Sequence, residues 1–163
     1  ENNILSICGD VLINNLLESN IKVVLRPHPM TLRNNKDQIL KLERTFAGNS
    51  DFTIQKEISN REVLFESNLL ITDWSGIGLE FGLGLNKPVI YIDVPKKIKN
   101  PDHELIGLTP IEITVREEIG VIIPVGKIST LSSCVQDQIR ERSNFRFNEA
   151  KKKYTFQKMT SSF

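Results

Sequence analysis

Residues 69–93 read LLITDWSGIGLEFGLGLNKPVIYID. The run at 69–72 is apolar and β-branched, which predicts a strand, and 77–85 has the apolar spacing of a helix. A second run, Val89 to Ile92, predicts another buried strand. A strand, a helix and a strand in this order form a βαβ unit, in which the two strands are parallel and the crossover is right-handed.

The same alternation extends in both directions from this unit. Further helices are predicted over 4–19, 35–47, 60–67 and 128–139, and further strands over 21–25, 52–54 and 121–125. Pro124 places the last strand at a sheet edge. The pattern predicts an α/β fold with a doubly wound parallel sheet, and ligands of such sheets bind beyond the carboxyl ends of the strands.

Length and composition narrow the class of protein. The 163 residues suit one domain, and 39% apolar and 25% charged residues are typical of globular chains. Because the chain starts at Glu1, it is interpreted as a fragment of a larger protein. Cys8 and Cys134 are too few for a disulfide framework, which favours a reducing compartment. No apolar run is long enough to span a membrane. No His, Asp or Glu cluster has metal-ligand spacing, so neither a structural metal nor a cofactor is expected.

Charge is distributed unevenly along the chain. Residues 140–163 carry seven Lys or Arg against Glu141 and Glu149, a net charge of +5, whereas the whole chain has +1. A basic segment on a mildly acidic body suggests an anionic surface or ligand near residues 140–163, and the alternative is a solvated helix face. Nucleic acid is not expected as a partner, because no basic stripe with interleaved aromatic residues is present.

The first candidate site is VVLRPHP at residues 23–29, directly after a predicted strand. Pro27 and Pro29 hold the residues before them extended, so the side chains of Arg26 and His28 project to the same side. A guanidinium matches phosphate oxygens, and an imidazole can donate a hydrogen bond or a proton. The alternative is a rigid loop in which His28 caps a backbone carbonyl.

The second candidate site is the turn from strand to helix after Thr72. Ser75 is predicted to cap the helix that follows. Gly76 and Gly78 leave the amides of Gly76, Ile77 and Gly78 open to an anion such as phosphate. The alternative is that these glycines only allow close packing on the sheet.

Charged residues flank this turn. Asp73 would repel a phosphate, and is therefore expected to orient Ser75 or His28, or to accept from amides of its own loop. Glu80 is a candidate acceptor for ribose hydroxyls. Lys96 and Lys97 follow the next strand, at the same edge of the sheet, where they would either neutralise a diphosphate or solvate the loop.

Three segments in this order, 23–29, 67–76 and 86–93, resemble the CDP-glycerol glycerophosphotransferase family. These are the polymerases and primases of wall teichoic acids and related capsule-building transferases. The resemblance covers about residues 21–100. It implies the two-lobed GT-B architecture, of which the whole chain, 1–163, would be one Rossmann-like, donor-binding C-terminal lobe.

The resemblance also implies roles for individual residues. His28 would assist the departing or transferring phosphate, and Asp73, Trp74, Ser75 and Gly76 would lie at the pyrophosphate of a nucleotide-diphosphate donor. Gly76 replaces the second serine of the family pattern. The general base would come from an N-terminal lobe, so this chain alone is expected to bind donor weakly and to catalyse little.

The family implies a cellular setting as well. The acceptor would be a lipid-linked polymer, and the enzyme would be cytoplasmic and peripheral on the inner face of the bacterial cell membrane, with the basic segment 140–163 against anionic lipid. Two alternatives stay open. One is a nucleotide-sugar GT-B glycosyltransferase or a relative of UDP-N-acetylglucosamine 2-epimerase, and the other is a non-catalytic module that docks on a membrane or a partner.

Overall fold

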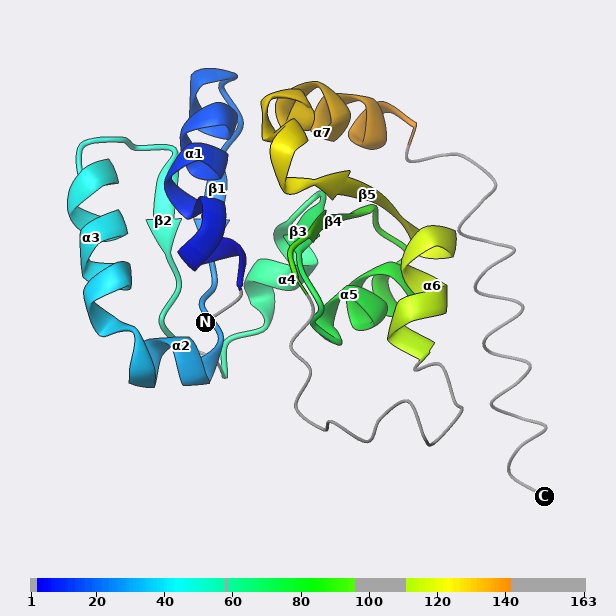
Figure 1. Ribbon diagram of the computed structural model, residues 1–163, viewed down its shortest axis with the longest axis horizontal. Helices are drawn as coiled ribbons and strands as arrows, with labels where there is room; N and C mark the ends of the chain where they lie inside the picture. Colours follow the sequence, from blue (N-terminus) through cyan, green and yellow to red (C-terminus); the bar gives the residue numbers. More distant parts are fainter. Residues whose placement is uncertain (1–2, 58, 96–110, 142–163) are drawn as a thin grey trace.

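The strands of the described residues form two hydrogen-bonded groups, and every pairing within each group is parallel (Figure 1). The computed structural model describes residues 3–57, 59–95 and 111–141. The first group joins β1 (Val23–Leu25) to β2 (Phe52–Ile54), and the second joins β3 (Leu70–Thr72), β4 (Val89–Asp93) and β5 (Gly120–Pro124) in that order. The α/β fold class with parallel, Rossmann-like organisation is therefore confirmed.

Helices connect the strands. The α-helices are α1 (Ile4–Glu18), α2 (Pro29–Asn34), α3 (Lys36–Phe46), α4 (Glu62–Glu66), α5 (Ile77–Leu79), α6 (Ile111–Ile119) and α7 (Leu131–Arg140). A π-helix, Glu80–Gly84, continues α5, and a 3₁₀ helix, Val125–Thr130, precedes α7. The sequence did not predict α2 or α6. The first is a single short helix that begins at Pro29, and the second is rich in β-branched residues, which weaken the helical signal.

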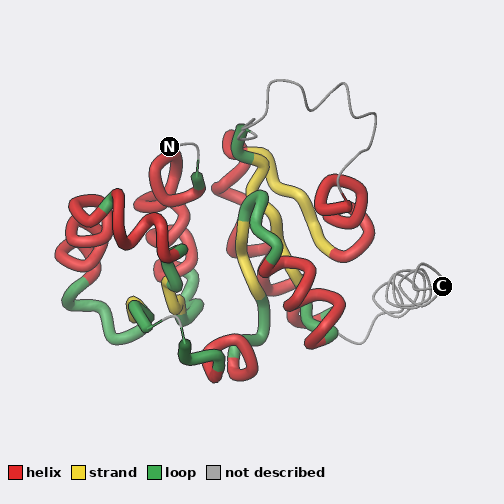
Figure 2. The backbone as a smooth tube through the Cα atoms, turned by 90° about the horizontal axis from the view of Figure 1, so that it is seen from below, coloured by secondary structure: helices red, strands yellow, loops and turns green. Residues whose placement is uncertain are grey.

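The three-stranded sheet is covered on both faces because successive side chains of β4 point in opposite directions. Ile90 and Ile92 pack into a core with α1, α3 and α7, whereas Val89 and Tyr91 pack into a second core with the α5 region and α6. Figures 1 and 2 show the helices on either side of the strands. This two-sided cover is the doubly wound arrangement that the sequence predicts.

The edge position predicted for the last strand is confirmed within the described residues. β5 pairs with β4 alone, and Pro124 is its final residue, opposite Asp93. A proline lacks the amide hydrogen that a central strand would need for its second neighbour. Cys8 and Cys134 are both free thiols, as expected.

The Asn86-Lys87-Pro88 segment has a structural role at the start of β4. Asn86 takes a positive φ of 54°, which closes the turn after the π-helix. The Lys87 ammonium then donates to the carbonyl oxygens of Leu64, Phe65 and Ser67 at the end of α4. Carbonyls at a helix C-terminus lack intrahelical donors, and a lysine satisfies them favourably. The lysine therefore ties α4 to the strand that follows the turn.

Gly78 lies where α5 packs against Tyr91 of β4. A Cβ at this position would lie 2.5 Å from Tyr91 Oη and 2.7 Å from its ring. Tyr91 is only 2% exposed, so the ring cannot swing away freely. The backbone of α5 thus approaches the sheet at a distance that only glycine allows.

We expect Gly78→Ala to lower the free energy of unfolding by about 1–3 kcal/mol, because an added methyl overpacks a rigid site. Gly84→Ala is the matched control: its Cβ would meet nothing within 4 Å. That variant should be neutral or gain up to about 1 kcal/mol from reduced freedom of the unfolded chain. Urea unfolding measures both. Equal stabilities of the two variants would contradict the close contact with Tyr91.

Candidate functional site

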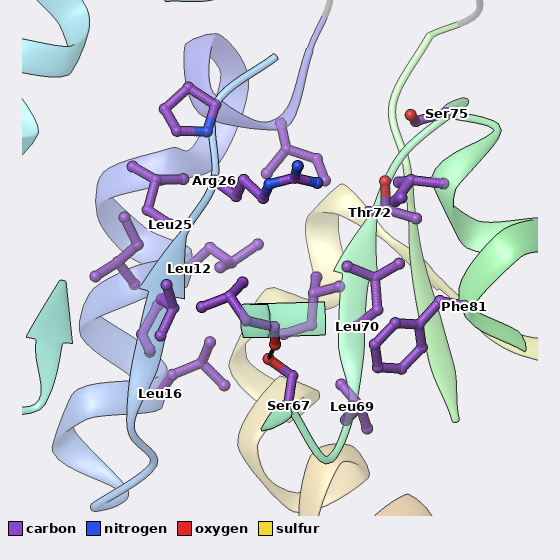
Figure 3. Close-up of a pocket in the computed structure, with 18 of the residues that line it drawn as sticks. Leu12, Leu16, Leu25, Arg26, Ser67, Leu69, Leu70, Thr72, Ser75 and Phe81 are labelled. Atoms are coloured by element: carbon purple, nitrogen blue, oxygen red, sulfur yellow. Dashed lines mark hydrogen bonds between the residues drawn. The ribbon is translucent and has the colours of Figure 1, made fainter. Parts of the chain in front are cut away.

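A cavity of about 680 Å³ lies between β1 and β3. These two strands face each other without a hydrogen-bonded ladder, and the cavity occupies the space between them (Figure 3). Its walls are mostly apolar and include Leu12 and Leu16 of α1, Leu25, Leu70 and Phe81. Polar side chains lie at both ends of the cavity: Asn20, Lys22, Ser67 and Asn68 precede β1 and β3, and Arg26, His28, Asp73 and Ser75 follow these strands. The end formed by the residues that follow β1 and β3 is called the polar rim here.

The polar rim brings together the two segments that the sequence singles out. Arg26, His28, Asp73 and Ser75 all line this one cavity, together with Ile77. Figure 3 shows the Arg26 guanidinium extending from the end of β1 toward the β3 side, where Thr72 and Ser75 lie. The convergence follows from the parallel strands, because their carboxyl ends meet at the same edge.

Three other predicted residues do not line the cavity. Gly76 is exposed at the start of α5, Gly78 is buried against Tyr91, and Glu80 is exposed further along the helix. Lys96 and Lys97 lie outside the described residues, as does most of the basic segment 140–163.

His28 is an exposed residue between β1 and α2. It has the extended backbone that the prolines predict, with φ −62° and ψ 145°, and it is the N-cap of α2. Its Nδ1 accepts a hydrogen bond of 3.1 Å from the Met30 amide. The expected alternative, a cap on a carbonyl, is wrong, because the ring accepts rather than donates. Since Nδ1 accepts, the neutral imidazole carries its proton on Nε2, which remains for a ligand.

Asp73 binds a different partner from the ones expected. Its Oδ2 accepts a 3.4 Å hydrogen bond from the Ile4 amide, the first residue of α1, rather than orienting Ser75 or His28. The N-terminus of a helix carries a partial positive charge. Asp73 therefore joins the loop after β3 to α1, and this contact offsets part of the repulsion that its carboxylate would exert on an anion.

The start of α5 corrects the prediction of three open amides. Gly76, not Ser75, is the N-cap, and no side chain caps this helix. The Gly78 amide donates 3.1 Å to the Ser75 carbonyl, so it is already used. Gly78 fits the alternative that the sequence left open, close packing on the sheet. The Ser75 side chain, free of the capping role, lines the cavity instead.

Arg116 of α6, which was not predicted from the sequence, lies against Trp74 of this loop. The residue is 2% exposed, and its guanidinium lies 3.6 Å from the centroid of the Trp74 ring and 5.0 Å from that of Tyr91. Asp93 Oδ1 is 3.6 Å from Nη2. Burial lowers the pKa of Arg116, and the carboxylates of Asp93 and Asp73 oppose that shift. The sequence held little signal for this role, because α6 itself was not predicted and Arg116 is followed directly by Glu117 and Glu118.

Tyr91 is another buried residue with a polar group in this region. Burial raises the pKa of Tyr91 to about 12, against the opposing effect of Arg116. Its hydroxyl therefore stays protonated at any physiological pH and acts as part of the packing surface under α5.

Comparison with known proteins identifies the family. A family model described as CDP-Glycerol:Poly(glycerophosphate) glycerophosphotransferase matches residues 7–96, more than half of the chain. The chain belongs to this family. The matched range includes the cavity residues from Arg26 to Ser75. The searches of curated proteins and of solved structures returned no match.

Family membership indicates a transferase of the glycerophosphotransferase type with a nucleotide-diphosphate donor. Among the described residues, no group of three or more His, Cys, Asp or Glu side chains is placed to hold a metal ion. In the same part of this glycerophosphotransferase family member, every helix is too short or too polar to traverse a bilayer. The chemistry available at the rim is that of a guanidinium, an imidazole Nε2–H and a hydroxyl, all of which can donate to an anion.

The capping role of His28 can be tested through the stability of the chain. We expect His28→Ala to lower the free energy of unfolding by about 0.5–2 kcal/mol, because the Met30 amide loses its acceptor. His28→Asn should retain most of that stability, since asparagine is a good N-cap. Urea unfolding measures both variants. A loss as large for asparagine as for alanine would show that the cap hydrogen bond does not stabilise α2.

Proposed function

We propose that this chain is the donor-binding lobe of an enzyme that transfers glycerol phosphate from CDP-glycerol to a teichoic acid or capsule polymer. The observation that carries the proposal is the convergence of Arg26, His28 and Ser75 on one cavity within the family-matched range. Phosphoryl-type transfer depends on positioning and charge neutralisation more than on covalent catalysis, and these three side chains supply donors for both.

The reaction assigns distinct roles to the rim residues. An acceptor hydroxyl oxygen attacks the phosphorus that bears glycerol, a new P–O bond forms, and the bond to CMP breaks with its electron pair on the CMP oxygen. Arg26 neutralises the diphosphate. His28 Nε2–H donates to the oxygen on which CMP leaves, and Ser75 donates to a non-bridging oxygen. The hydroxyl proton leaves to a base on the second lobe of a GT-B enzyme.

The cellular setting belongs to the same proposal. The acceptor is a lipid-linked polymer, so the enzyme works at the cytoplasmic face of a bacterial membrane. The net charge of +5 on residues 140–163 supports contact with anionic lipid, at about 1 kcal/mol per Lys or Arg near the surface. Lys96 and Lys97 are further candidate phosphate ligands, on the basis of their position after β4.

Two alternatives make different predictions. A nucleotide-sugar transferase or epimerase-like lobe would prefer UDP to CDP. A docking module would bind neither nucleotide, and its attachment would depend on Lys151, Lys152 and Lys153. Family membership favours the transferase over both.

The test uses the one tryptophan of the chain, Trp74, which adjoins Ser75. We expect CDP-glycerol and CDP to change its fluorescence at lower concentrations than UDP or UDP-N-acetylglucosamine. Arg26→Gln should weaken CDP binding by about tenfold or more, because a hydrogen bond to a charged group contributes about 1.5–3 kcal/mol.

The matched control is Arg33→Gln on α2, an exposed arginine that does not line the cavity. It should bind CDP as the unsubstituted chain does. Preference for UDP would transfer the assignment to the nucleotide-sugar enzymes. A folded chain that binds no nucleotide, and that loses vesicle binding on neutralising Lys151 to Lys153, would support the docking module instead.

A further inference from the structure

A guanidinium stacked on the only tryptophan lies directly behind the cavity rim. Arg116 comes from α6 and Trp74 from the loop after β3. The guanidinium carbon lies over the Trp74 ring, 3.6 Å from its centroid. Arg116 is 2% exposed, whereas the side chain of its ion-pair partner, Asp93, is half exposed. Arg116 does not line the cavity, so it would not touch a ligand there.

We propose that Arg116 is a positioning residue for the nucleotide site: by stacking on Trp74 it holds the loop of residues 73–76 so that Ser75 faces the cavity. The inference rests on the proposed function, because it concerns binding of the donor at that rim. It adds a residue from α6, outside both sequence segments that define the site and outside the family-matched range.

Geometry favours stacking over the ion pair as the restraint. The 3.6 Å between Arg116 Nη2 and Asp93 Oδ1 is longer than a hydrogen bond, and Nε and Nη2 have no hydrogen-bond partner among the described residues. Burying an arginine with incomplete partners is unfavourable. The close partners that remain are the aromatic faces of Trp74 and Tyr91, and a desolvated cation on such a face is attracted by its quadrupole.

Through its neighbours in sequence, Asp73 and Ser75, Trp74 couples the contact with Arg116 to the cavity rim. Its Nε1 donates a 2.7 Å hydrogen bond to the Val94 carbonyl just after β4, so the indole edge is held as well as its face. The residue before it, Asp73, is bound to the Ile4 amide, and the residue after it, Ser75, lines the cavity. A change in the Trp74 orientation would therefore displace Ser75 relative to Arg26.

The first test removes the stacking of residue 116 on Trp74 but keeps its positive charge. Arg116→Lys retains a cation and loses the planar group. We expect acrylamide to quench Trp74 more strongly in this variant, and CDP to bind about 3- to 10-fold more weakly. Asp93→Asn removes the ion pair at a half-exposed position and should leave both quenching and CDP binding unchanged. Arg140→Lys, at an exposed arginine of α7, is the matched control for the substitution itself.

Three results would overturn the inference. Unchanged quenching in Arg116→Lys would show that the cation does not restrain Trp74. Increased quenching with unchanged CDP binding would show that the loop position does not matter to the site. An equal loss in Asp93→Asn would show that the ion pair, not the stack, is the restraint.

Two further comparisons keep the test decisive. If Arg116→Lys does not fold, calorimetric CDP titrations of Trp74→Phe and Trp74→Leu replace it, since only phenylalanine keeps an aromatic face for the guanidinium. Leucine must weaken binding more than phenylalanine, and an equal loss overturns the inference. If the unsubstituted chain binds no nucleotide, the proposed function fails. Acrylamide quenching in Arg116→Lys then still tests whether Arg116 restrains Trp74.

Discussion

The anchoring of Trp74 is the contact on which the arrangement of the site depends. A loop that carries a serine and an aspartate at the rim of a cavity has little apolar surface of its own to hold it. Here the indole is fixed through its edge to the Val94 carbonyl and through its face to Arg116. One side chain therefore connects the loop after β3 to the end of β4 and to α6.

The second constraint on the site is that the strands form two separate parallel groups, β1-β2 and β3-β4-β5. Parallel strands place all their carboxyl ends at one edge, so Arg26 and His28 after β1 lie near Asp73 and Ser75 after β3. Because β1 and β3 do not pair, an apolar cavity separates them while the polar residues remain at its rim. The gap between the two groups thus makes room for a ligand where a continuous sheet would leave none.

The strands and most helices were predictable from local patterns, since β-branched apolar runs and helical spacing depend on neighbours in sequence. The strand at Val89–Asp93 was expected over 89–92 and agrees within one residue. The helices α2 and α6 were missed because their local signals are weak. The hydrogen bond of Asp73 to Ile4 spans 69 residues, a separation over which no local pattern carries information.

The sequence alone determined the fold class, the parallel order of strands and helices, the extended backbone at His28 and the two segments that meet at the rim, because each follows from periodicity or from the fixed φ of proline. Only the tertiary structure decided that Gly78 packs on Tyr91, that Asp73 binds the start of α1, and that Arg116 stacks on Trp74. Those contacts join residues far apart in the chain, and their geometry exists only once both sheet faces are covered.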